Sequence, residues 1–150
     1  MKKLATVLAA AIMLLSASAF AKDSNDTKAT TKVEKSFKTD FSNAENTTWR
    51  KIGDVFIANF SVNNVELEAA YNSDGELVGT LKKVQVQDLP LAVTLAIGKK
   101  YNGYEVAKKA EEITFEKQTS YYVNIANKKE ILKLKCSVNG ELTVDKRTKI

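Results

Sequence analysis

The chain has 150 residues and a net charge of +5, from 23 Lys and Arg against 18 Asp and Glu, and 44% of its residues are hydrophobic. This length suits one ordinary domain, or two small halves that share a core, and it allows folding without disulfides. Acidic and basic residues alternate without a block of one sign, which argues against a nucleic acid or an anionic membrane as partner. The sequence has no histidine, the usual general base and the commonest zinc ligand, and its single cysteine, Cys136, excludes an intramolecular disulfide.

Residues 1–21 have the pattern of a secretory signal peptide. Lys2 and Lys3 precede the apolar run Leu4–Leu15, and Ala19-Phe20-Ala21 is a small-x-small cleavage site. The apolar run is too short to span a bilayer permanently. We therefore expect cleavage after Ala21, a mature charge of +3 after loss of the two lysines, and a periplasmic or secreted protein without a membrane span.

The first half predicts a helix followed by an antiparallel meander. Residues 22–31 are polar and predict a flexible leader. Val33, Phe37 and Phe41 recur at intervals of four and predict a short amphipathic helix that ends before Asn46. The period then changes to two. This change predicts a short strand at residues 49–52 and longer strands at 56–62, 65–71 and 76–86, with turns at 63–64 and 72–75.

The second half predicts the same order of elements. A helix begins at Asp88 as N-cap, with Pro90 in its first turn and a stripe of apolar residues every fourth position from Leu89 to Tyr101. Strands follow at 104–117, 121–126, 130–138 and 141–145, and Asn139-Gly140 is a strong hairpin signal.

The two halves match each other when the first is shifted by 65 positions, which places Phe56 on Tyr121 and Gly75 on Gly140. Such a long period indicates a duplicated unit. The predicted fold class is therefore α+β, with two tandem helix-plus-antiparallel-meander repeats at 32–87 and 88–150, and both helices packed on one face of the sheet.

The face opposite the helices is the candidate partner-binding face. Strand alternation assigns to it nine candidate residues: Ile57, Asn59, Glu66, Glu68, Tyr122, Asn124, Ile131, Lys133 and Lys135. Equivalent positions differ in charge, since Glu68 matches Lys133. The face is interpreted either as a solvated surface of mixed charge or as a binding surface with Tyr122, Ile57 and Ile131 as apolar anchors.

These patterns resemble the PepSY-like proteins, a family described as similar to beta-lactamase inhibitor proteins. The matching features are the signal peptide, Phe37-x-x-x-Phe41 followed by Trp49, Leu89-Pro90 before the second helix, and Gly140 in the last hairpin. The resemblance covers about residues 33–145. It implies tandem helix-plus-meander units, export to a bacterial envelope and a curved sheet that grips a protein partner. It implies no established activity, and it assigns no individual residue a role.

A search for chemistry finds no catalytic, metal or cofactor site. There is no phosphate-binding loop, and Cys136 alternates with core residues. The pairs Glu111-Glu112 and Glu66/Glu68 are interpreted as solubilising. The sequence therefore predicts a non-catalytic exported binding module that needs no cofactor and binds another envelope or secreted protein. The resemblance implies that an inhibitor of a peptidase or hydrolase is one form of this. The alternatives are a small-ligand carrier with its site between helices and sheet, and an enzyme with an unusual site. The oligomeric state stays open.

Overall fold

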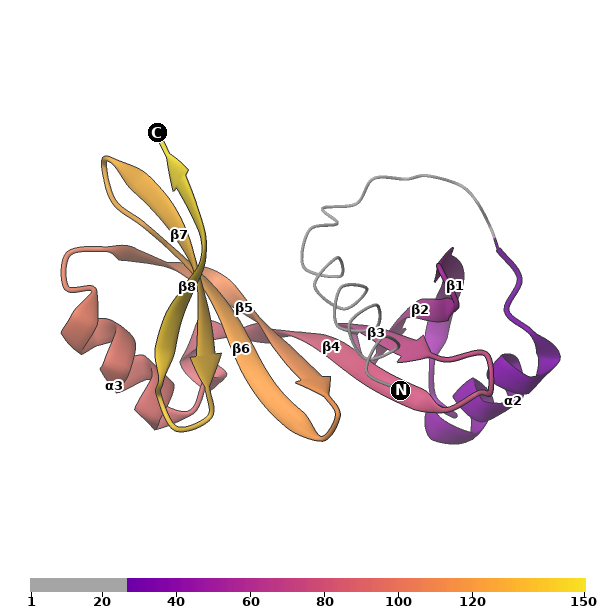
Figure 1. Cartoon of the computed structure of the whole chain (residues 1–150). Coiled ribbons are helices and arrows are strands. Elements are labelled where there is room, and N and C mark those ends of the chain that lie inside the picture. Colours follow the sequence, from indigo (N-terminus) through magenta and orange to yellow (C-terminus); the bar gives the residue numbers. More distant parts are fainter. Residues whose placement is uncertain (1–26) are drawn as a thin grey trace. The chain divides into compact units, whose positions relative to one another are not determined.

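The computed structural model describes residues 27–150. The predicted signal peptide, 1–21, lies outside these residues, as does the predicted leader up to residue 26. Within residues 27–150 there are two α-helices, one 3-10 helix and eight strands (Figure 1). In chain order they are α2 (Thr31–Asp40), β1 (Glu45–Ile52), β2 (Val55–Val62), β3 (Val65–Tyr71), β4 (Leu77–Gln85), η1 (Val86–Asp88), α3 (Leu91–Lys100), β5 (Glu105–Phe115), β6 (Gln118–Ala126), β7 (Glu130–Ser137) and β8 (Leu142–Lys149).

The strands form one open antiparallel sheet whose order follows the sequence from β1 to β8. The predicted fold class, two tandem helix-plus-meander repeats with both helices on one face, is therefore wrong: the architecture is a single eight-stranded sheet with two short helices. The matching turns and core residues specify hairpins, but they do not specify where a sheet ends. β4 runs unbroken through Lys82-Lys83, as the predicted strand at 76–86 does, although the chain divides there into two compact units, Met1–Lys82 and Lys83–Ile150.

In the first unit, α2 packs on alternate residues of β2 and β3. Thr30 caps the helix, because its Oγ1 accepts a hydrogen bond of 3.3 Å from the backbone N–H of Val33. Phe37 is the centre of an aromatic cluster, with ring centroids 5.2 Å from Trp49, 5.0 Å from Phe60 and 6.3 Å from Tyr71, each edge to face. Apolar side chains at every fourth position of the helix therefore pack against side chains at every second position of the strands.

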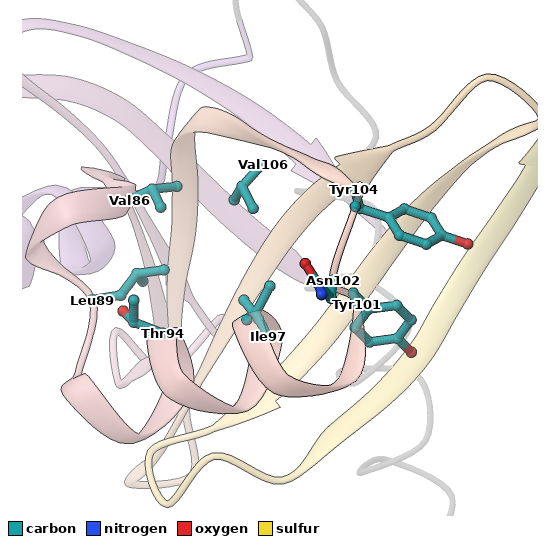
Figure 2. Close-up of a pocket in the computed structure, with 10 residues that line it drawn as sticks. Val86, Leu89, Thr94, Ile97, Tyr101, Asn102, Tyr104 and Val106 are labelled. Atoms are coloured by element: carbon teal, nitrogen blue, oxygen red, sulfur yellow. The ribbon is translucent and has the colours of Figure 1, made fainter.

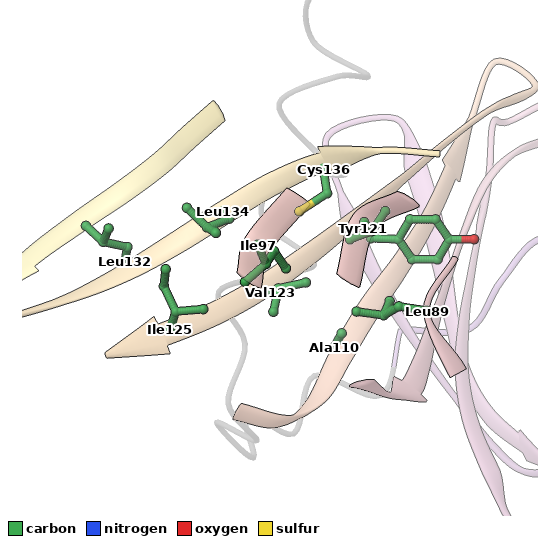
Figure 3. Packing of buried hydrophobic residues seen from close by; sticks show 10 residues of the cluster. Leu89, Ile97, Ala110, Tyr121, Val123, Ile125, Leu132, Leu134 and Cys136 are labelled. Carbon is green, nitrogen blue, oxygen red and sulfur yellow. The ribbon is translucent and has the colours of Figure 1, made fainter. Parts of the chain in front are cut away.

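In the second unit, α3 packs on β5, β6 and β7 in the same manner. Val93 and Ile97 are buried against alternate residues of the strands (Figure 3): Ala110, Tyr121, Val123, Ile125, Leu132, Leu134 and Cys136. Phe56 and Tyr121, which the shift of 65 positions places on each other, are both buried, each in the core of its own unit. Cys136 is fully buried here as a small core residue, and burial raises the pKa of its thiol to about 11.

Tight turns fix the hairpins where the sequence placed them. Asn63 and Asn64 both have positive φ, as do Gly75 and Gly140. A turn at Glu116-Lys117, also with positive φ at both residues, was not predicted, because neither residue is typical of a turn.

The predicted N-cap of the second helix is also wrong. Asp88 ends η1, and the extended residues Leu89 and Pro90 intervene, so α3 begins at Leu91 without a side-chain cap.

Candidate binding face

On β1, β2 and β3, the face turned away from α2 carries a half-buried ion pair. The cross-strand register pairs Arg50 with Ile57 and Asn59 with Glu68. Arg50 Nη2 lies 2.9 Å from Glu68 Oε2, so this pair crosses β2 diagonally. Both side chains are largely covered, with 28% and 17% of their surface exposed. An arginine–carboxylate contact at this distance holds both groups in a defined position.

On β5, β6 and β7, the face turned away from α3 carries a second half-buried pair. The register pairs Glu111 with Tyr122 and Asn124 with Lys133. Lys133 Nζ lies 3.0 Å from Glu111 Oε2 and 5.1 Å from the centroid of the Tyr122 ring. The ammonium group is thus held by a carboxylate and an aromatic face together. Burial, with Asp145 and Glu111 nearby, raises the pKa of Tyr122, so its hydroxyl stays protonated.

The two pairs have the same geometry with the charges exchanged. In the first unit the basic residue, Arg50, lies on β1 and the acidic residue, Glu68, lies on β3. In the second unit the acidic residue, Glu111, lies on β5 and the basic residue, Lys133, lies on β7. Sequence reasoning found Glu68 and Lys133 but missed the importance of their partners, Arg50 and Glu111. Strand alternation alone places both partners on this face, so the signal was present in the sequence.

The structure divides the nine predicted face residues by exposure. Ile57 and Tyr122 are buried, and Ile131 is 43% exposed, so only one of the three predicted apolar anchors is open in this structure. Asn59, Glu68 and Lys133 are half-buried, and the remaining three are exposed: Glu66, Asn124 and Lys135. Glu68 and Asn59 are neighbours in one unit; Tyr122, Lys133 and Lys135 are neighbours in the other. Their role in binding stays a prediction.

A pocket of about 250 Å³ lies beside α3 in the second unit, where the alternative function placed a ligand site. Leu89, Ile97 and Val106 give it an apolar lining (Figure 2). Tyr104 stands at its edge and donates a hydrogen bond of 2.7 Å to Glu130 Oε1, and this bond is the main cause of its raised pKa.

Residues 27–150 contain no group of three or more metal-binding side chains. Within the same residues, no helix combines the length and the apolar character that a membrane crossing requires.

Three solved structures with the same fold are from species of Bacteroides. A BLIP-like protein from Bacteroides fragilis is 19% identical, with a TM-score of 0.70 over 85% of this chain and 91% of that one. A protein from Bacteroides eggerthii, provisionally named as periplasmic, is 17% identical, with a TM-score of 0.70 over 83% and 91%. A DUF2874 family protein from Bacteroides ovatus is 20% identical, with a TM-score of 0.70 over 82% and 89%.

This chain has a BLIP-like fold. The sequence matches none of the protein families to which it was compared, and none of the curated proteins. At identities of 20% or below, the likeness to the solved structures extends to the fold alone. None of the three is named as an enzyme.

Proposed function

We propose that the protein is an exported, non-catalytic binding module that holds another envelope or secreted protein on its sheet, through the face of each unit that is turned away from its helix; Glu68 lies on this face in the first unit and Lys133 in the second. The supporting observation is that each unit has one ion pair on this face, with the acidic and basic positions exchanged between the units. The pairs are Arg50–Glu68 at 2.9 Å and Glu111–Lys133 at 3.0 Å. Side chains fixed in advance lose less conformational entropy when a partner binds, and charges of fixed sign select the partner.

The partner in this proposal is a peptidase or another hydrolase, which the module inhibits. The support is analogy of fold: one neighbour is named BLIP-like, and the sequence motifs resemble the PepSY-like proteins, to which we assign the chain as part of the same proposal. Export after cleavage at Ala21 belongs to the proposal too. Amino-terminal sequencing of the protein recovered outside the cytoplasm tests it, and we expect Lys22 as the first residue.

Affinity capture from the envelope of the producing cells tests the binding face. Lys133→Glu removes the pair with Glu111, and Lys135→Glu reverses an exposed charge on the same face. Lys128→Glu, in the exposed turn between β6 and β7, is the matched control. We expect both face variants to lose the partner while the control keeps it, with circular dichroism showing all three folded. If both face variants retain every partner, the face is not the binding surface.

A small-ligand carrier is the second candidate, and the pocket beside α3 favours it. Its volume of about 250 Å³ suits a small, mostly apolar molecule. Native mass spectrometry of freshly isolated protein then shows a reproducible added mass that Gly98→Leu, at the pocket wall, removes. A spectrum with the mass of the bare chain alone contradicts the carrier function.

A further inference from the structure

The outer face of α3 is apolar, although it faces solvent. Leu91 and Leu95 are 71% and 63% exposed, and they lie one helical turn apart on the same side. Ala92, Thr94 and Gly98 are also exposed and carry no charge, and the charged residues of the helix, Lys99 and Lys100, are confined to its last two positions. A short surface helix normally presents charged residues on this side.

The other α-helix among the described residues, α2, provides the comparison. α2 has the same length and also buries two apolar residues, Val33 and Phe37. Its exposed positions include Lys32, Lys35 and Lys38. α3 needs no more apolar residues than α2 does to pack on its own strands, because Val93 and Ile97 are 0% and 4% exposed and already fill that role. The two exposed leucines therefore contribute nothing to the core of their own unit.

We propose that this face binds the same face of a second copy of the chain, with the two α3 helices antiparallel about a two-fold axis. The support is charge complementarity. Exposed Asp88 precedes the helix at its amino-terminal end, and Lys99 and Lys100 occupy its last turn. Antiparallel pairing brings the acid of each copy to the lysines of the other and opposes the two helix dipoles favourably, so one surface complements itself.

The charge distribution favours a second copy over a membrane surface. A helix that lies on anionic lipid carries lysines along the flanks of its apolar stripe. In α3, Lys99 and Lys100 are at the carboxyl-terminal end, and Asp88 precedes the amino-terminal end. Gly98, which is exposed and has no atom within 4 Å of an added Cβ, also allows the facing backbone to approach closely.

The size of the face sets the strength of the interaction. Ten helical residues extend about 15 Å. A face of this length buries far less area than the roughly 1,200 Å² of total surface that stable complexes bury. The dimer is therefore weak, and we expect it at hundreds of micromolar protein and not at a few micromolar.

Analytical ultracentrifugation of the full chain across this concentration range tests the proposal. We expect concentration-dependent dimers in the wild type and at least a tenfold higher dissociation constant for Leu95→Lys. Lys35→Ala, on the outer face of α2, is the control and dimerises as the wild type does. A wild type that is monomeric at every concentration, or a dimer that Leu95→Lys leaves intact, overturns the proposal.

A charge exchange tests the antiparallel arrangement. Asp88→Lys alone, or Lys99→Asp with Lys100→Asp, places like charges together and weakens the homodimer; an equimolar mixture of these two variants restores association. A mixture that stays as weak as either variant contradicts this geometry. Binding of phosphatidylglycerol vesicles that depends on Leu95, in place of dimerisation, assigns the face to a membrane and refutes the second copy. All these readouts are independent of the partner on the sheet face.

Discussion

The β7–β8 turn packs closely against α3 at Gly140, and the substitution Gly140→Ala tests how much this packing contributes to stability. Gly140 has φ +87, and a Cβ added there lies 2.6 Å from the Ala92 carbonyl oxygen and 3.0 Å from its carbon. Gly103 has the same φ of +87 but no atom within 4 Å of the added Cβ. The two glycines therefore share the conformational cost of a side chain and differ in the steric cost.

The magnitudes follow from these contacts. A left-handed conformation costs an L-residue about 1–2 kcal/mol, and this is the whole expected loss for Gly103→Ala. Forcing a methyl group against backbone atoms adds about 1–3 kcal/mol, because either the turn or the helix must move. We therefore expect Gly140→Ala to lower the free energy of unfolding by about 2–5 kcal/mol, at least 1 kcal/mol more than Gly103→Ala.

Urea denaturation of both variants and the wild type, followed by circular dichroism, measures the difference. Equal m-values are required for the comparison, since a change in slope indicates a change in the unfolded or native ensemble. Losses that agree within about 0.5 kcal/mol would refute the reasoning, because the turn would then not be held against α3.

Three further predictions follow from the two cores. Tyr71→Phe removes the hydrogen bond of 2.8 Å from the buried hydroxyl to the Asp40 carboxylate, and we expect urea denaturation to show a loss of about 1 kcal/mol. Phe37→Ala empties the centre of the aromatic cluster beside Trp49, and we expect a loss of about 3–5 kcal/mol in the same assay; a loss below 1 kcal/mol contradicts the packing. With its pKa raised to about 11, the Cys136 thiol stays protonated at pH 8 and resists 5,5′-dithiobis(2-nitrobenzoate) until urea unfolds the chain. Because an unfolded thiol ionises near pH 9, the contribution of Cys136 to the stability of the folded state is fully present below that pH and is lost as the pH rises towards 11. Rapid labelling of the native protein would show that Cys136 is not buried.

Local signals in the sequence predicted most of the elements. The four-residue spacing of Val33 and Phe37 and the positive-φ turns at Asn63-Asn64 and Gly140 are properties of a few neighbouring residues, and the structure confirms them. The hairpin at Glu116-Lys117 was missed because its turn lacks glycine and asparagine. The sequence left open whether the two halves form one continuous sheet, because β4 shows no local sign of where the pairing of one unit ends.

The candidate site was less predictable, because burial depends on distant residues. Alternation put Ile57 and Tyr122 on the correct face of their strands but gave no indication that both are buried. The contact of Lys133 with both Glu111 and Tyr122 joins three strands, so no pattern within one strand contains it. The exposed leucines of α3 lay outside the predicted stripe of Leu89, Val93 and Ile97, and only the structure shows that they have no core to fill.

Site-specific photo-crosslinking in the producing cells tests the central claim most directly, namely that a protein partner binds the sheet face. A benzophenone amino acid replaces Lys135, which is exposed on that face, or Lys128, which is exposed in the neighbouring turn. The account predicts a discrete adduct of one partner from position 135 and none from position 128. An adduct that forms only from position 128, or no adduct from position 135 while the protein is folded and exported, contradicts the claim.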